Sequence, residues 1–158
     1  MRIKLTYLLL FLLSFFGGLA QSELSLARQY YQQEEYEKAL EYLESAESKG
    51  TNKNIYRLKL DCYLALEDYR QAERYVERQI KQSQYRNFDY YADLCYVYNI
   101  QEKYNQADKL VEDILERVEK NPGFSYGFAN AFQRSGYPRI ALEIYQTAER
   151  VMPNSNYV

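Results

Sequence analysis

Four alanines recur along this chain at almost constant intervals. Ala39, Ala72, Ala107 and Ala141 lie 33, 35 and 34 residues apart. Each is the fourth residue of a short segment that resembles the start of a helix: YEKA, YRQA, YNQA and PRIA. A period of about 34 residues is typical of stacked helical hairpins, in which every repeat buries its apolar face against its neighbours. Such a period favours an extended binding surface over catalytic machinery.

Each repeat contains two segments with apolar residues at positions i, i+3, i+4 and i+7, which is the stripe of an amphipathic helix. The third repeat shows it most clearly, with Tyr91, Leu94, Cys95 and Tyr98 followed by Ala107, Leu110, Val111 and Ile114. No alternating pattern of a strand follows residue 20. We therefore predict an all-α chain of about four hairpins, at about residues 22–50, 53–83, 88–119 and 122–153 within a repeat domain of residues 21–153.

The repeat positions also predict how the hairpins pack. The alanines are expected to let the two helices of a hairpin approach closely, because a larger side chain would strain the packing. Rings at Tyr30, Tyr63, Tyr98 and Phe132 are expected to fill the space between hairpins. A ladder of rings that binds carbohydrate is the alternative interpretation. In the fourth repeat, Gly136 and Pro138 mark the turn between helices, and Asn121-Pro122 marks a helix start.

The first twenty residues have the three parts of a secretory signal peptide. Arg2 and Lys4 are followed by the apolar run LTYLLLFLLSFF, and Gly18 and Ala20 precede the expected cleavage before Gln21. An uncleaved anchor is the alternative, but the run is shorter than the ~20 residues of a spanning helix. We predict an exported, periplasmic protein with no stable membrane insertion after cleavage.

Composition argues against several functions. The formal net charge is −2, so the chain lacks the basic footprint that nucleic acid requires. Histidine is absent, and with it the commonest proton-transfer group and metal ligand. Carboxylate pairs such as Glu41 with Glu44 are expected to be solvated charge, not general acids. We predict no metal, no cofactor and no catalysis.

Two cysteines leave two interpretations open. Cys62 and Cys95 fall in the first helices of adjacent repeats, and export to an oxidising compartment would permit a disulfide. The other interpretation is that both are small buried residues at helix contacts. Two cysteines this far apart are too few for a structural zinc site.

The repeats resemble tetratricopeptide repeats (TPRs). The resemblance spans about residues 22–153 and is carried by LARQYYQQEEYEKALEYLESA and FANAFQRSGYPRIALEIYQTAERVMP. Repeats two and three depart from the family pattern, since Leu60 and Cys95 replace a small residue, and Gln79 and Ile114 replace a later alanine. The leader and the many tyrosines are also similar to exported repeat proteins of Bacteroidota. The resemblance implies a right-handed solenoid whose first helices line a concave face.

Carrying over the family's groove positions implies a partner-binding strip on those first helices. The ten residues are Arg28, Tyr31, Asn54, Arg57, Asp61, Tyr96, Asn99, Tyr126, Asn130 and Arg134. Tyrosine and arginine are enriched at interface hot spots, whereas a solvated helix face is the plain alternative. The lysine, asparagine and arginine set with which some family members hold a terminal carboxylate is not reproduced. The resemblance thus implies a non-catalytic scaffold that binds a protein or peptide in the cell envelope.

The end of the chain suggests a second function. Residues 154–158 stand where a further repeat would begin, so the chain is either the N-terminal part of a longer array or has an end that meets a partner. Solenoids need a polar cap at their ends. Self-association or assembly through an apolar patch of Ile140, Ile144 and Val151 is therefore the alternative function.

Overall fold

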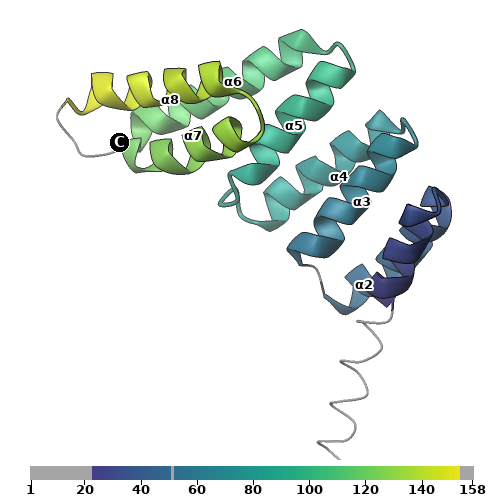
Figure 1. Ribbon diagram of the computed structural model, residues 1–158. Coiled ribbons are helices and arrows are strands. Elements are labelled where there is room, and N and C mark those ends of the chain that lie inside the picture. Colours follow the sequence, from purple (N-terminus) through teal and green to yellow (C-terminus); the bar gives the residue numbers. More distant parts are fainter. Residues whose placement is uncertain (1–22, 51, 154–158) are drawn as a thin grey trace, which may run out of the picture. The chain divides into compact units, whose positions relative to one another are not determined.

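The computed structural model describes residues 23–50 and 52–153, which form helices joined by short turns (Figure 1). No strand occurs in these two described ranges. The predicted fold class, an all-α chain of helical hairpins, is confirmed. The predicted leader at residues 1–20 and the tail at residues 154–158 lie outside the described residues.

The chain divides into two compact units, one up to Asp68 and one from Tyr69. The first contains a helix at residues 23–32, α2 (Tyr36–Lys49) and α3 (Lys53–Ala65). The second contains α4 (Tyr69–Gln82), α5 (Asp89–Ile100), α6 (Tyr104–Lys120), the short 3-10 helix η1 (Pro122–Phe124), α7 (Ser125–Arg134) and α8 (Pro138–Val151). The division falls between the two helices that the sequence assigns to the second repeat, so this repeat contributes one helix to each unit.

The first unit has a core of small and medium side chains. Its fully or nearly fully buried members are Ala27, Ala39, Leu43, Ala46, Ile55 and Cys62. Helix α2 packs against α3, and α3 begins where the Asn52 side-chain oxygen accepts hydrogen bonds from the amides of Asn54 (2.9 Å) and Ile55 (3.1 Å). This cap satisfies donors that the first helical turn leaves free.

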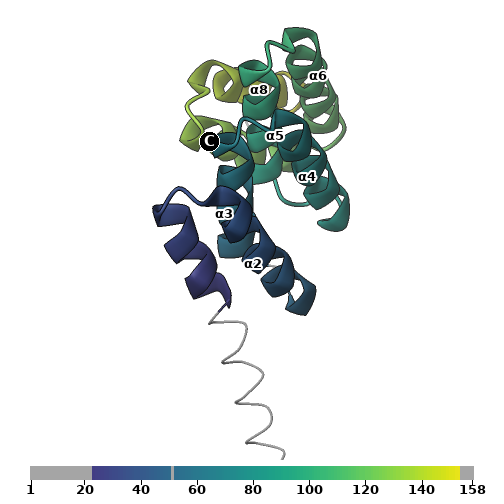
Figure 2. The same cartoon turned by 90° about the vertical axis from the view of Figure 1, so that its right-hand side faces the viewer.

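In the second unit the first helices of two hairpins lie side by side, and so do their second helices. Helix α5 packs against α6 and α7, while α8 packs against α7 and α6 (Figure 1; Figure 2). Phe128, Phe132, Ile114 and Ile144 are completely buried or nearly so between them. The prediction that Ile144 belongs to an exposed apolar patch is therefore wrong, because its side chain is part of the helix–helix core.

The turns within the repeats share one pattern of hydrogen bonds. In the turn of the first repeat, the amide of Glu35 donates to the carbonyl of Tyr30 (3.0 Å). The amide of Glu34 donates to the carbonyl of Tyr31 (3.1 Å). Glu34 adopts a left-handed φ of 61°, which makes this turn a Schellman motif. The equivalent left-handed residues are Glu67, Glu102 and Gly136, with φ of 55°, 58° and 84°. Each stands five positions before a repeat alanine, so the alanine period is also the period of these helix ends.

Both cysteines are buried free thiols. Burial raises the pKa of Cys62 to about 12 and the pKa of Cys95 to about 11. Of the two interpretations, the structure supports small buried residues that fill helix contacts. A thiol with a raised pKa is a poor nucleophile at neutral pH.

Candidate functional site

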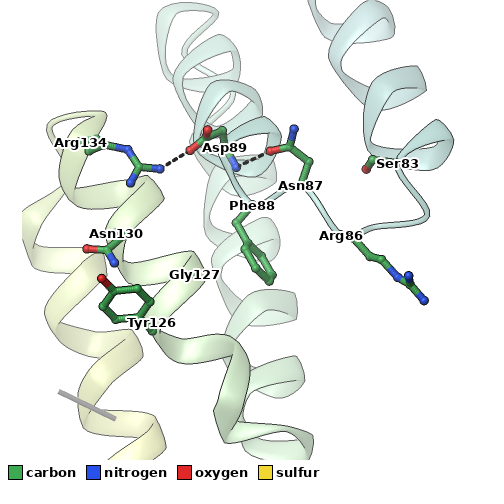
Figure 3. Close-up of a pocket in the computed structure, with 9 residues that line it drawn as sticks. All are labelled: Ser83, Arg86, Asn87, Phe88, Asp89, Tyr126, Gly127, Asn130 and Arg134. Atoms are coloured by element: carbon green, nitrogen blue, oxygen red, sulfur yellow. Dashed lines mark hydrogen bonds and ion pairs between the residues drawn. The ribbon is translucent and has the colours of Figure 1, made fainter. Parts of the chain in front are cut away.

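A pocket of about 450 Å³ opens in the second unit between α7 and the segment that joins α4 to α5. Figure 3 shows the side chains that line it, which come from residues 83–89 on one side and from α7 on the other. The lining residues are Ser83, Arg86, Asn87, Phe88, Asp89, Tyr126, Gly127, Asn130 and Arg134. The pocket thus joins a polar connecting segment to the exposed face of a helix.

Phe88 forms the apolar part of this pocket and is held by neighbouring rings. Its ring centroid lies 4.5 Å from that of Phe128 and 5.8 Å from that of Phe124. Gly127 allows α7 to approach this ring, because a Cβ at position 127 would collide with Phe88. A glycine inside a helix is unfavourable by roughly 1 kcal/mol relative to alanine. Its presence in α7 is explained by this close approach.

The polar rim is partly fixed by two interactions. Arg134 donates to Asp89 across the pocket, with Nη2 and Oδ1 2.5 Å apart (Figure 3). The Asn87 side-chain oxygen accepts a hydrogen bond of 3.1 Å from the amide of Asp89 and so holds the first turn of α5. The Arg134 side chain is 64% exposed, so the ion pair adds little stability. Its effect is to orient the two side chains.

The rest of the rim is open to a ligand. Tyr126 is 62% exposed, and Asn130 one helical turn later is half-buried beside it (Figure 3). Arg86 lies on the opposite side with its side chain directed away from α7 in Figure 3, and its guanidinium has no ion-pair partner among the described residues. A ring, an amide and a guanidinium around an apolar floor can bind a peptide segment through stacking and backbone hydrogen bonds.

Three of the predicted strip residues meet in this pocket: Tyr126, Asn130 and Arg134. Tyr96 is exposed on α5 two turns after Asp89 and is not among the lining residues. Asn99 is engaged internally, since its amide nitrogen donates to the carbonyl of Cys95 at 2.9 Å. Asn99 therefore serves the fold of α5, and its side chain is less available to a partner than the resemblance implies.

The other five predicted residues belong to the first unit. Arg28, Asn54 and Arg57 are exposed, while Tyr31 and Asp61 are half-buried. Burial and the nearby Asp61 carboxylate raise the pKa of Tyr31. The Arg57 guanidinium lies 5.6 Å from the ring centroid of Tyr56 on its own helix. The role of these five residues in binding stays a prediction.

Sequence reasoning did not identify the pocket residues of the connecting segment. Residues 81–87, KQSQYRN, read only as a polar link between two repeats. Their conformation includes left-handed backbone at Gln84 (φ 53°) and Tyr85 (φ 62°), which turns the chain back toward α7. The one available signal was Gly127, because a glycine inside a helical pattern suggests a packing or functional reason.

Other kinds of site find no support in the described ranges. No group of three or more metal-ligating side chains occurs in residues 23–50 and 52–153. Within the same residues, no helix has the length and apolar content needed to cross a bilayer. The absence of catalysis stays a prediction from the sequence.

Comparison with known proteins gives one family match. Residues 12–79 match the family described as anaphase-promoting complex, cyclosome, subunit 3. The match covers less than half of the chain and begins inside the predicted leader. The similarity to that family therefore does not extend beyond α4. A comparison with curated proteins found no match.

Several solved structures are similar to the chain. YrrB, described as a TPR protein with an unusual peptide-binding site, is 16% identical, with 89% of this chain and 73% of YrrB covered and a TM-score of 0.45. A structure of MamA is 19% identical, with 84% and 77% covered and a TM-score of 0.46. A second one, MamA AMB-1, is 14% identical, with 87% and 75% covered and a TM-score of 0.47.

Proposed function

We propose that this chain is an exported, non-catalytic scaffold of tetratricopeptide type that binds a protein or peptide in the cell envelope. The observation that carries the proposal is the pocket between residues 83–89 and α7. Exposed Tyr126, half-buried Asn130 and Arg134 surround an apolar floor there. An accessible ring beside hydrogen-bonding groups is the chemistry of a peptide-binding hot spot.

The chemistry of the pocket favours an extended peptide segment with one apolar side chain. Phe88 offers a ring face for that side chain, while the amide of Asn130 can both donate to and accept from a peptide backbone. Asp89 neutralises Arg134, so Arg86 is the cation left to select an acidic neighbour in the peptide.

Selection of peptides from a displayed library, with the full-length chain as the target, tests whether the pocket binds peptides. We expect enriched peptides whose binding weakens about tenfold or more when Tyr126→Ala or Asn130→Ala is introduced. Tyr104→Ala is the matched control, because Tyr104 is a tyrosine of the same unit that is 57% exposed and lies outside the pocket. Peptides that bind all three variants equally would show that the pocket is not the binding site.

The proposed export rests on residues 1–20 and is tested separately. Expression of the whole gene in a bacterial host, followed by mass measurement, should give a protein that begins at Gln21 and is recovered on release of the periplasm. An intact Met1 or Arg2 terminus in the mature protein would contradict it.

Self-association is a second candidate function, and exposed apolar side chains in the second turn of α8 and at its C-terminal end support it. Leu142 is 57% exposed, Val151 42% and Met152 43%. Light scattering of the full-length chain should then show an apparent mass that rises with concentration, and Leu142→Glu with Val151→Glu should abolish the rise. A constant monomer mass would remove this candidate.

A further inference from the structure

A smaller pocket of about 180 Å³ lies in the second unit among α4, α5 and α6. Tyr91 and Leu94 of α5 line it, whereas Asp89 of α5 lines the larger pocket. Residues 91 and 94 lie about 140–200° around the helix from residue 89, so the two pockets use different faces of α5. A ligand of the smaller pocket would therefore bind apart from the larger one, and the inference drawn from it does not rest on the proposed function.

An arginine that lies over two tyrosine rings lines this smaller pocket. The Arg117 guanidinium lies 5.4 Å from the ring centroid of Tyr85 and 5.9 Å from that of Tyr91. Tyr91 is itself fixed by an edge contact with Phe128, with centroids 5.1 Å apart. Rings against the face of a guanidinium leave its N–H edge free to form hydrogen bonds.

Two hydrogen-bond donors of this pocket have no acceptor among the residues that the structure describes. No hydrogen bond or ion pair of the Arg117 side chain occurs within the described part of the chain. The hydroxyl of Tyr91 is also buried without a hydrogen-bond partner, in a side chain that is only 3% exposed. Burial raises the pKa of Tyr91, and the positive charge of Arg117 opposes that rise. An orphaned buried hydroxyl in a native protein calls for an explanation such as a missing ligand.

Charge and wall chemistry restrict what can bind. Ile80, Leu94 and Leu110 supply apolar walls. Lys81 adds a second cation, but Glu77 and Asp113 add two acids, so the local formal charge is balanced. A doubly charged phosphate would be repelled by both carboxylates, whereas a single carboxylate matches the planar guanidinium edge.

We propose that the pocket among α4, α5 and α6 binds a monocarboxylate with a small apolar body through Arg117 and the hydroxyl of Tyr91. The carboxylate belongs either to a free organic acid or to an acidic side chain of a partner protein. The apolar body lies against Ile80, Leu94 and Leu110 in both cases.

Titration of the isotope-labelled full-length chain, followed through its backbone amide NMR shifts, tests this proposal. The probes are 3-phenylpropanoate and a capped alanine tripeptide with a central glutamate. Their neutral counterparts are 3-phenylpropanamide and the glutamine tripeptide. We expect shifts around residues 80–94 and 110–117 with a Kd of the order of millimolar for a carboxylate probe, and much weaker binding of its amide. Binding of the tripeptide identifies a partner's side chain as the source, and binding of the organic acid alone identifies a small molecule.

Variants localise the effect. Arg117→Gln should weaken carboxylate binding about tenfold or more, and Tyr91→Phe should weaken it several-fold while keeping the ring in place. Arg74→Gln, a change at an exposed arginine of α4 that lines neither pocket, is the matched control and should leave the affinity unchanged. The proposal is overturned if neither carboxylate binds, if acid and amide bind equally, or if Arg117→Gln binds like the unchanged protein.

Discussion

Phe88 occupies the space into which a side chain at position 127 would project. The two residues lie 39 positions apart in the sequence, on opposite walls of the larger pocket. Gly127→Ala would improve the helix propensity of α7 by roughly 1 kcal/mol if nothing else changed. Because Phe88 is held between Phe124 and Phe128, the ring cannot move without loss of packing.

We therefore predict that Gly127→Ala lowers the free energy of unfolding by about 1–3 kcal/mol, the usual range for overpacking. Urea unfolding followed by circular dichroism measures the change. Phe88→Leu in the same background should recover part of the loss, because the smaller side chain makes room for the new methyl group. If the two changes are additive, the close approach of these residues is not the cause.

The left-handed residues of the Schellman turns give a second prediction. Glu102 adopts a φ of 58°, which costs a residue with a Cβ about 1 kcal/mol or more relative to glycine. Glu102→Gly should therefore raise the free energy of unfolding, by up to about 1 kcal/mol after the extra entropy of glycine in the unfolded chain is counted. The reverse change, Gly136→Ala at φ 84°, should lower it by about 1 kcal/mol.

Both changes lie in the second unit, and urea unfolding of each variant measures them under the same conditions. Glu112→Gly, at an exposed position inside α6, is the control and should be destabilising by about 1 kcal/mol. A stabilising effect at position 112 or a destabilising one at 102 would contradict the assignment of the turn.

The repeat pattern predicted the helices well because every part of it is local. Helical stripes and the glycine and proline of the fourth turn depend on neighbours within a few residues. Three of the four left-handed turn positions carry glutamate, which has no special preference for that backbone. They follow from the hairpin geometry and could not be found from residue type alone.

Only the α7 side of the larger pocket could be predicted from the sequence, because only that side depends on local spacing. Tyr126, Asn130 and Arg134 lie on one helix face, so helical spacing alone groups them. Residues 83–89 reach the pocket because Gln84 and Tyr85 turn the chain and because Phe88 packs beneath Gly127. Gly127 is a local signal of a close approach, but the sequence does not show which residue approaches it, and the turn at residues 84 and 85 has no local signal. Asn99 was assigned to the strip by position, but its bond to the carbonyl of Cys95 depends on the side-chain rotamer, which the sequence does not specify.

The buried thiols predict a loss of stability at high pH. In the unfolded chain the thiols ionise near pH 8.5, whereas in the folded chain their pKa is about 11 for Cys95 and about 12 for Cys62. The raised folded pKa means that the stabilising contribution is complete below about pH 8.5 and is lost as the pH rises toward 11–12. Burial also raises the pKa of Tyr98 to about 12, which adds to the same trend.

Urea midpoints at pH 8 and pH 10.5 measure this dependence, and Cys95→Ala should make it shallower. At pH 8, iodoacetamide should leave both thiols of the folded chain unmodified and label both after denaturation. Fast labelling of the folded chain at pH 8 would show that the thiols are accessible and not buried.

Lys59 breaks the apolar pattern of its repeat, and its environment explains why it is tolerated. The residue is only 3% exposed, and its ammonium lies 2.7 Å from Oε2 of Glu47 on α2. A second carboxylate, of Glu44, lies 3.9 Å away. The pair joins α3 to α2 inside the first unit, where desolvation of the charges offsets most of their attraction.

Two changes at this pair should therefore differ in effect. Lys59→Met removes the charge and keeps an apolar stem of similar length, so we expect the free energy of unfolding to stay within about 1 kcal/mol of the unchanged protein. Glu47→Met takes the nearest carboxylate from an ammonium that stays buried, and we expect a loss of about 2–3 kcal/mol, reduced from the usual value because Glu44 remains nearby. Urea unfolding of both variants and of the double variant measures the difference. The double variant should be more stable than Glu47→Met alone, because it no longer buries an ammonium without its closest partner. If Lys59→Met and Glu47→Met instead lose equal free energy of unfolding, the pair is a net source of stability.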